Sequence, residues 1–306
     1  MGLTLVPTML ASTSGDGMNS INQHIIATAH GPIVVEDRAG AGIPLVLIHG
    51  NSSCLGVFRC QIEGDALRDR RVIAFDLPGH GRSGDAPDPD RSYNRSGLAD
   101  ATLAVLGRLG VTEAVVLGWS LGGHIGIELL TRFPGLRGLI IVGTPPVPRG
   151  GMAQGFVTSP HRMLAGREQL SAPEAAAFVE TIFGASAEPF LIEAALRTDR
   201  RFRKRLFEAA RAGDGIDQRQ AVETSRIPLA VVNGAADRLV NLDYIDTPAY
   251  ANLWTRSCLR LTGLGHAPFW EAPEMFNPIL DRFLADVAPV AGCPASHLEP
   301  RARRRG

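Results

Sequence analysis

The sequence predicts an α/β protein built on a mostly parallel, doubly wound sheet, with a helical lid inserted after the sixth strand. Continuous apolar runs of strand length alternate with segments of helical length, as in sheets that helices bury on both faces. The clearest runs are residues 43–48, 71–75, 114–117, 139–143 and 227–234. Strand-like runs vanish between residues 147 and 226, where only helical patterns remain.

The composition suits one large α/β domain with an insertion, or two small domains, because 45% of the 306 residues are hydrophobic. Lys plus Arg and Asp plus Glu both total 31, so charge provides no attraction to nucleic acid or to an anionic membrane. No apolar run reaches the roughly 18–20 residues that span a bilayer. We therefore expect a small, weakly charged partner, and neither nucleic acid nor membrane.

Both chain ends are expected to be disordered tails, over residues 1–22 and 291–306. The apolar patch at residues 3–6 lacks a preceding Lys or Arg and is interrupted by Pro7, so it does not favour a secretory signal. Met18 is an alternative start. The four cysteines lack the spacing of a zinc site, which favours reduced thiols in a cytoplasmic protein.

The α/β core is expected from residues 23–146 and 227–290. It begins with a β-hairpin over residues 25–37. The strand at 43–48 then ends in His-Gly-Asn-Ser-Ser, small residues that leave room for a ligand and expose backbone N–H groups. We expect the N–H of Asn51 to bind an oxyanion. The alternative is a turn residue whose side chain bonds to its own backbone.

The strand at 71–75 leads into a turn that contains Asp76 and His80. Either side chain could serve catalysis, but this turn is dense in Gly and Pro. We therefore expect both side chains to fix a tight loop. A helix over roughly residues 92–109 follows and leads to the next strand.

Ser120 lies in Gly-Trp-Ser-Leu-Gly, after the strand at 114–117 and before a helix-like segment at 125–130. This spacing, between a strand and a helix, predicts a nucleophile elbow, a sharp turn that exposes the serine above the strand ends. The N–H of Leu121 would then lie at a helix N-terminus, where it can bind an oxyanion. The alternative is a glycine-rich turn with an idle serine.

The helical segment at 147–226 follows a strand end, so we expect it to cover Ser120 as a lid. Its apolar residues either pack the lid itself or face the cleft. They include Met163, Leu164, Phe178, Ile182, Phe183, Phe190 and Leu191. The basic stretch at 197–211 is interrupted by acidic residues and has no aromatic ladder, which indicates a solvated helix face.

Ser120, Asp237 and His266 each follow a predicted strand, so they should meet at one edge of the parallel sheet. Their order, nucleophile then acid then base, is the order of a serine hydrolase on this scaffold. His266 can take the serine proton and return it to the leaving group, while Asp237 holds the imidazole tautomer. Asp243 and Asp246 are alternative acids, but they lie further along, in the next predicted helix.

No cofactor and no metal are expected. The eight histidines form no H-x-H or H-E-x-x-H cluster that could hold zinc. No glycine-rich loop has dinucleotide-binding spacing.

We expect the substrate to contact Gly50 in the loop after the strand at 43–48, Trp119 in the elbow and Phe178 in the lid.

Taken together, these motifs resemble the α/β-hydrolase superfamily over nearly the whole span from His24 to Val287, and within it the serine-dependent N-acyl-homoserine lactone lactonases. The resemblance rests on HGNSS at 49–53, DLPGHG at 76–81, DPDRSY at 88–93, GWSLGGHIGIE at 118–128, GTPPV at 143–147 and GHAPF at 265–269. It implies quorum quenching, with Ser120, Asp237 and His266 as the triad and Asn51 and Leu121 as oxyanion donors. That family has glutamate where this chain has Asp237, and either carboxylate can orient a histidine.

Three other functions remain open on the same residues. A carboxylesterase for small acyl esters would use the same triad, because substrate choice depends on the lid. Cleavage of the amide in the same signal requires better-placed acid catalysis for the amine. A ligand receptor on a hydrolase scaffold would bind without turnover. Relatives with an aspartate nucleophile are disfavoured, because position 120 is serine.

Overall fold

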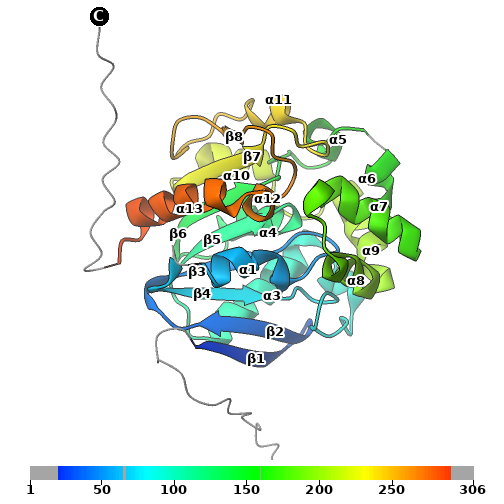
Figure 1. Cartoon of the computed structure of the whole chain (residues 1–306), viewed down its shortest axis with the longest axis horizontal. Helices are drawn as coiled ribbons and strands as arrows, with labels where there is room; N and C mark the ends of the chain where they lie inside the picture. The colour runs from blue at the N-terminus through cyan, green and yellow to red at the C-terminus, as the bar shows by residue number, and fades with distance from the viewer. Residues whose placement is uncertain (1–19, 65–66, 159, 291–306) are drawn as a thin grey trace, which may run out of the picture.

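The computed structural model describes residues 20–64, 67–158 and 160–290, which fold around an eight-stranded sheet (Figure 1). The strand order is β1-β2-β4-β3-β5-β6-β7-β8. The β1–β2 hairpin is antiparallel and joins β4 antiparallel, whereas β3 to β8 are parallel. The strands are β1 (Ile21–Thr28), β2 (Gly31–Arg38), β3 (Ala41–Ile48), β4 (Arg70–Phe75), β5 (Ala114–Trp119), β6 (Leu136–Val142), β7 (Leu229–Gly234) and β8 (Leu259–Leu261). The predicted fold class is confirmed.

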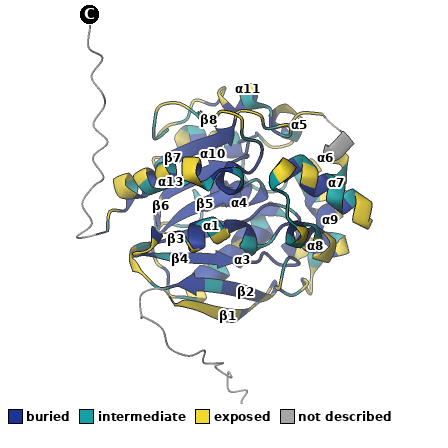
Figure 2. Cartoon of the chain, in the orientation of Figure 1, coloured by how far each residue is buried: buried dark blue, intermediate teal, exposed yellow. Residues whose placement is uncertain are grey.

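Helices cover both faces of the sheet, which explains why its central strands are apolar throughout. Val46 and Ile48 of β3 pack into the cluster shared with one helical layer, while Leu45 and Leu47 pack into the other. The first layer contains α3 (Arg95–Arg108), α4 (Leu121–Leu129) and α10 (Gln218–Thr224), and the second contains α1 (Arg59–Ile62), α12 (Pro268–Glu271) and α13 (Pro273–Val287). Figure 2 shows the resulting buried centre and the exposed edge strand β1.

The segment between β6 and β7 is helical and lies at the carboxyl ends of the parallel strands (Figure 1). Its helix α7 starts at a capping box, in which Ser171 and Glu174 satisfy the first backbone N–H groups. The last helix, α10, packs against α4 and so joins the layer that covers the sheet. The helices before α10 are α5 (Met152–Gly155), α6 (Pro160–Ala165), α7 (Ala172–Phe183), α8 (Pro189–Arg197) and α9 (Arg200–Arg211).

Two expectations need adjustment. The predicted N-terminal tail runs too far, because β1 begins at Ile21 and pairs with Arg38 of β2. Residues 1–19 and the tail predicted at 291–306 lie outside the described residues. The basic stretch is not wholly solvated, because Arg203 of α9 is buried, with 1% of its surface exposed.

Cys54, Cys60 and Cys258 are free thiols, and Cys293 lies outside the described residues. No helix in the described part of the chain is both long and apolar enough to span a bilayer.

Two buried histidines hold the loops that follow β3 and β4. The Nε2 atom of His49 accepts the N–H of Leu77 at 3.0 Å, and that of His80 accepts the N–H of Ser52 at 3.2 Å. Both rings are 0% exposed, and burial lowers the pKa of each imidazole below its usual value. Folding therefore requires both rings to be neutral.

We expect the free energy of unfolding to fall as pH drops below about 6.5, because the unfolded histidines bind protons there and the folded ones do not. Each ring contributes up to about 1.4 kcal/mol per pH unit in that window. Urea denaturation at pH 7.5 and 5.5 measures the difference. The variant His24→Gln is the control. Because His24 is exposed, this variant should show the same difference between the two pH values as the unchanged protein. Equal stabilities at the two pH values would contradict the expectation.

Candidate active site

Ser120 occupies a strained turn between β5 and α4, with φ 53° and ψ −114°. A non-glycine residue in such a conformation costs about 1–3 kcal/mol, so the surrounding structure must enforce it. The N–H of Ser120 donates to the carbonyl of Val142 at 2.8 Å. A Cβ at Gly122 would lie 1.9 Å from the carbonyl oxygen of Ile48, and one at Gly123 would lie 2.1 Å from a Thr144 hydroxyl. The elbow therefore requires glycine at both positions.

The side chains of Asp237 and His266 meet just beyond β7 and β8, with 2.8 Å between Asp237 Oδ2 and His266 Nδ1. The other carboxylate oxygen accepts the backbone N–H groups of Leu239 at 2.8 Å and Val240 at 3.1 Å. Burial alone would raise the pKa of Asp237, but His266 and these N–H groups outweigh it and lower the pKa. The carboxylate is therefore charged and holds the proton of His266 on Nδ1.

The loop that carries His266 is fixed on both sides of the imidazole. Its carbonyl accepts the indole N–H of Trp119 at 2.9 Å. The carboxylate of Glu271 in α12 accepts the backbone N–H groups of Gly265 at 2.7 Å and Ala267 at 3.0 Å. Sequence reasoning missed Glu271. The available signal was an acidic residue in the first turn after the loop's proline.

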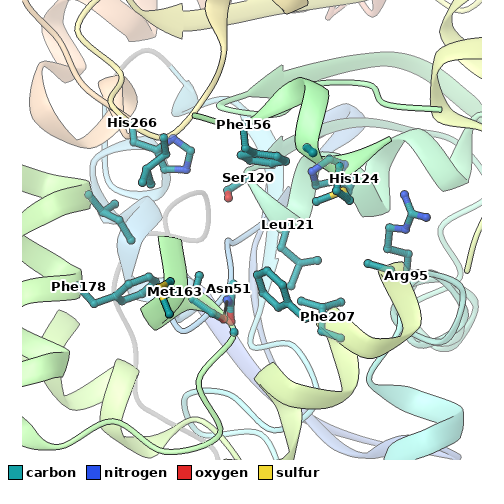
Figure 3. A pocket seen from close by; sticks show the side chains of 18 of the residues that line it. Asn51, Arg95, Ser120, Leu121, His124, Phe156, Met163, Phe178, Phe207 and His266 are labelled. Carbon is teal, nitrogen blue, oxygen red and sulfur yellow. Dashed lines mark hydrogen bonds between the residues drawn. The ribbon is translucent and has the colours of Figure 1, made fainter. Parts of the chain in front are cut away.

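A cavity of about 570 Å³ lies between the sheet edge and the lid, and Ser120 and His266 both line it (Figure 3). This size falls within the roughly 300–1,000 Å³ of small-molecule sites. Asp237 is not among its lining residues and supports His266 from behind. The lid contributes mostly apolar side chains, among them Phe156, Met163, Phe178, Ile182, Leu206 and Phe207.

The predicted substrate contacts divide in two. Trp119 and Phe178 line the cavity, whereas Gly50 does not. A Cβ at Gly50 would lie 2.9 Å from the Trp119 ring, so close packing explains this glycine.

The apolar residues predicted in the lid fall into two groups, those that face the cavity and those that pack inside the protein. Met163 and Ile182 face the cavity, while Phe183 packs against Trp119 with ring centroids 5.5 Å apart.

The two predicted oxyanion donors, Asn51 and Leu121, both lie on the cavity wall, and Leu121 is the first residue of α4. The side chain of Asn51 does not cap its own backbone. Its Nδ2 donates to the carbonyl of Ala165 in the lid at 2.9 Å, and its Oδ1 accepts the Ser52 hydroxyl at 2.9 Å. These bonds tie the loop after β3 to α6.

Buried Arg203 extends this connection into α9. Its Nε donates to the Ser52 hydroxyl at 2.7 Å, and its Nη2 donates to the carbonyl of Ala195. Burial lowers the pKa of Arg203 to about 10, so the guanidinium is still charged at neutral pH. Arg203, Ser52, Asn51 and Ala165 thus form a chain of hydrogen bonds, the lid relay, that crosses from one lid helix to another through the Asn51 loop.

The remaining polar residues have structural positions. Asp76 accepts the backbone N–H groups of Leu55 at 2.7 Å and Arg82 at 2.8 Å, as expected for a residue that fixes a loop. Asp243 is 98% exposed and Asp246 pairs with Arg260 at 2.5 Å, so neither alternative acid contacts His266. Within the described ranges, no group of three or more His, Cys, Asp or Glu side chains is placed to hold a metal ion.

Gly143 provides a test of the His266 position. Its φ is +61°, and a Cβ there would lie 2.7 Å from Cε1 of His266. We expect Gly143→Ala to lower kcat/KM for an activated ester by about 100-fold, because displacement of a catalytic group by about 1 Å has that effect. Gly110→Ala is the matched control. Gly110 has φ +65° with nothing within 4 Å of a Cβ, so it bears the same backbone strain away from the site. Equal losses in both variants would contradict a specific role for Gly143.

Comparisons with known proteins match this fold and this sequence to hydrolases. A crystal structure of the N-acyl homoserine lactonase AidH complexed with N-butanoyl homoserine matches with a TM-score of 0.85 and 45% identity, covering 90% of this chain and 100% of that chain. The esterase RhEst1 from Rhodococcus sp. ECU1013 matches with a TM-score of 0.71 and 26% identity, covering 88% and 99%. Among sequence relatives, the pimeloyl-[acyl-carrier protein] methyl ester esterase of Stenotrophomonas maltophilia (strain R551-3) is 29% identical over 278 residues, 83% of this chain and 97% of that protein.

Residues 45–279 match the Alpha/beta hydrolase family. The match spans most of the sheet, the elbow, the lid and the loop of His266. The chain belongs to the alpha/beta hydrolase family.

Proposed function

We propose that this protein is a metal-independent serine hydrolase that opens the lactone ring of N-acyl-homoserine lactones. One observation carries the proposal: Ser120 and His266 line a single cavity, with Asp237 hydrogen-bonded behind the imidazole. The similarity to AidH, at 45% identity over nearly the full length of both chains, supports the choice of substrate. Ring opening of such signals by a cytoplasmic enzyme would quench quorum sensing.

The proposed reaction begins when His266 Nε2 takes the proton of Ser120 and the serine oxygen attacks the lactone carbonyl. The N–H groups of Asn51 and Leu121 stabilise the negative oxygen of the tetrahedral intermediate, and Asp237 stabilises the imidazolium. Collapse breaks the ring ester bond, and His266 returns the proton to the alkoxide. The alcohol stays tethered to the acyl group. Water activated by His266 then releases the acyl-homoserine.

The cavity lining fits this substrate. A neutral lactone head requires hydrogen-bond donors at its carbonyl and no counter-ion. The acyl chain requires an apolar surface, which Phe156, Met163, Phe178 and Phe207 provide. Burial of each methylene contributes about 0.8 kcal/mol to binding, so chain length should affect affinity strongly.

A carboxylesterase that acts on other small acyl esters is the second candidate. The observation that favours it is the set of sequence relatives, pimeloyl-[acyl-carrier protein] methyl ester esterases at 29–30% identity. The same triad would serve either substrate. A receptor that binds without turnover is the third candidate, and the complete arrangement around Ser120 speaks against it.

We expect incubation with an N-acyl-homoserine lactone to give one product heavier by one water, about 18 Da, because ring opening adds water across the ester. The product should re-close on acidification and should be absent with Ser120→Ala, as mass spectrometry can establish. Free fatty acid with homoserine lactone would indicate amide cleavage. Turnover of aryl esters alone would leave the carboxylesterase, and turnover of neither would favour the receptor.

The acid assignment has its own test. We expect Asp237→Asn to lower kcat by about 10⁴-fold with little change in fold, because the imidazole loses its preferred tautomer. Asp243→Asn is the matched control, because Asp243 is almost fully exposed on α11 (Leu242–Ile245). Steady-state kinetics on an activated ester measure both. A loss below tenfold in Asp237→Asn would reject Asp237 as the acid.

A further inference from the structure

A second imidazole lines the cavity, and the proposed reaction does not use it. His124 lies in α4, four residues after Ser120, and only 5% of its surface is exposed. In Figure 3 it lies on the side of Ser120 away from His266, beside Phe156. The two rings of His124 and Phe156 have centroids 6.0 Å apart. The cavity lining as a whole is mostly apolar and includes Met152, Ala153 and Leu206, but Arg95 also lines it and lies close enough to affect the charge of His124.

Hydrogen bonds to Gln218 of α10 fix the tautomer of His124. The amide nitrogen of Gln218 donates to the backbone carbonyl of His124 at 3.0 Å. The amide oxygen must therefore be the atom that lies 2.6 Å from Nδ1 of the imidazole. An amide oxygen can only accept, so Nδ1 carries the proton. The other ring nitrogen, Nε2, is left with a lone pair and no proton.

The ring is neutral at physiological pH. Burial, and after it the charge of nearby Arg95, lower the pKa of His124 to about 4. Arg95 itself is held in place, because its Nη2 donates to the carbonyl of Asp214 and its backbone N–H donates to the carboxylate of Asp214 at 2.9 Å. The imidazole therefore presents an acceptor, and never a cation, to a bound molecule above about pH 5.

The Nε2 atom of His124 is buried and has no hydrogen-bond partner among the described residues. A buried polar atom left unpaired costs about 1–3 kcal/mol, so such atoms usually have a partner in the functioning molecule. Because Nε2 can only accept, that partner must be an N–H or O–H group. Because His124 lines the cavity, a molecule bound there lies next to the imidazole.

We propose that His124 is a specificity-determining residue whose Nε2 accepts a hydrogen bond from an N–H or O–H group of the bound substrate. The inference deepens the proposed function and rests on it. Simple alkyl and aryl esters have no such donor. An N-acyl-homoserine lactone has one in its amide N–H, and a 3-hydroxyacyl chain adds a second. A 3-oxo group would instead place a carbonyl oxygen near the lone pair of His124 Nε2, and two acceptors form no hydrogen bond.

The test uses the full-length Ser120→Ala protein, so that affinity is measured without turnover. Calorimetry compares two matched pairs of ligands. The first pair is N-hexanoyl-homoserine lactone and its ester isostere, in which oxygen replaces the amide N–H. The second pair is the 3-hydroxyhexanoyl and hexanoyl lactones. We expect one pair to differ by about 10- to 100-fold in Kd, because an acceptor left unpaired has that effect.

The second protein is Ser120→Ala combined with His124→Asn. The asparagine amide can replace Nδ1 as the donor to Gln218 but has no atom at the position of Nε2, so the local bond survives while the acceptor is lost. We expect the affinity ratio to fall to about one. His30→Asn in the same background is the control and should keep the ratio, because His30 is buried elsewhere and bonds to Ser92 at 2.9 Å.

The outcomes separate cleanly. Loss of the ratio in the first pair assigns the amide N–H as the donor, and loss in the second pair assigns the acyl hydroxyl. An unchanged ratio in His124→Asn, or no measurable binding of any ligand, overturns the inference. Failure of the wild-type enzyme to open any of these lactones would reject the proposed function, and the affinity ratios would still decide the role of His124.

Discussion

The strained backbone of Ser120 is the constraint on which the site depends. A serine at φ 53° is unfavourable. The conformation persists because the N–H of Ser120 bonds to the carbonyl of Val142 and because β3 packs closely against the turn. The same turn starts α4, whose first residue, Leu121, lines the cavity, and His124 lines it one turn later. One local distortion thereby brings together Ser120, Leu121 and His124, the residues proposed as nucleophile, oxyanion donor and substrate acceptor.

Electrostatics follow from the same arrangement. Asp237 is a fully buried carboxylate whose charge is kept by His266 and two backbone N–H groups, and such fixed groups act strongly where water is excluded. His266 and His124 both line the cavity, but their proposed roles differ because their surroundings differ. Asp237 holds a proton on Nδ1 of His266, whereas burial, and after it the charge of Arg95, lower the pKa of His124. Two identical side chains thus acquire different chemistry.

The sheet, the elbow and the positions of Asp237 and His266 could be predicted from sequence, because each depends on a local pattern: an apolar strand followed by a turn of small residues. The helices of the lid could also be predicted, because a helix depends on a local pattern. The contacts that the lid makes could not be predicted, because they join residues far apart in the sequence. Arg203 bonds to Ser52 across 151 residues of sequence, and Gln218 bonds to His124 across 94. Neither contact can be detected from composition or periodicity. The packing of Gly50 against Trp119 could not be predicted either, because a glycine that makes room for a tryptophan looks the same in sequence as one that makes room for a ligand.

The lid relay has a consequence for how proteins of this kind can diversify. Lids are often treated as modules that can be exchanged over a constant sheet. Here Arg203 and Ala165 of the lid bond to Ser52 and Asn51 of the sheet domain, so a grafted lid without a matching arginine would remove one of the bonds that hold the Asn51 loop. Point changes among the cavity-lining lid residues escape that restriction. Substrate range should therefore drift by single substitutions within one lid and should resist the wholesale shuffling of lids.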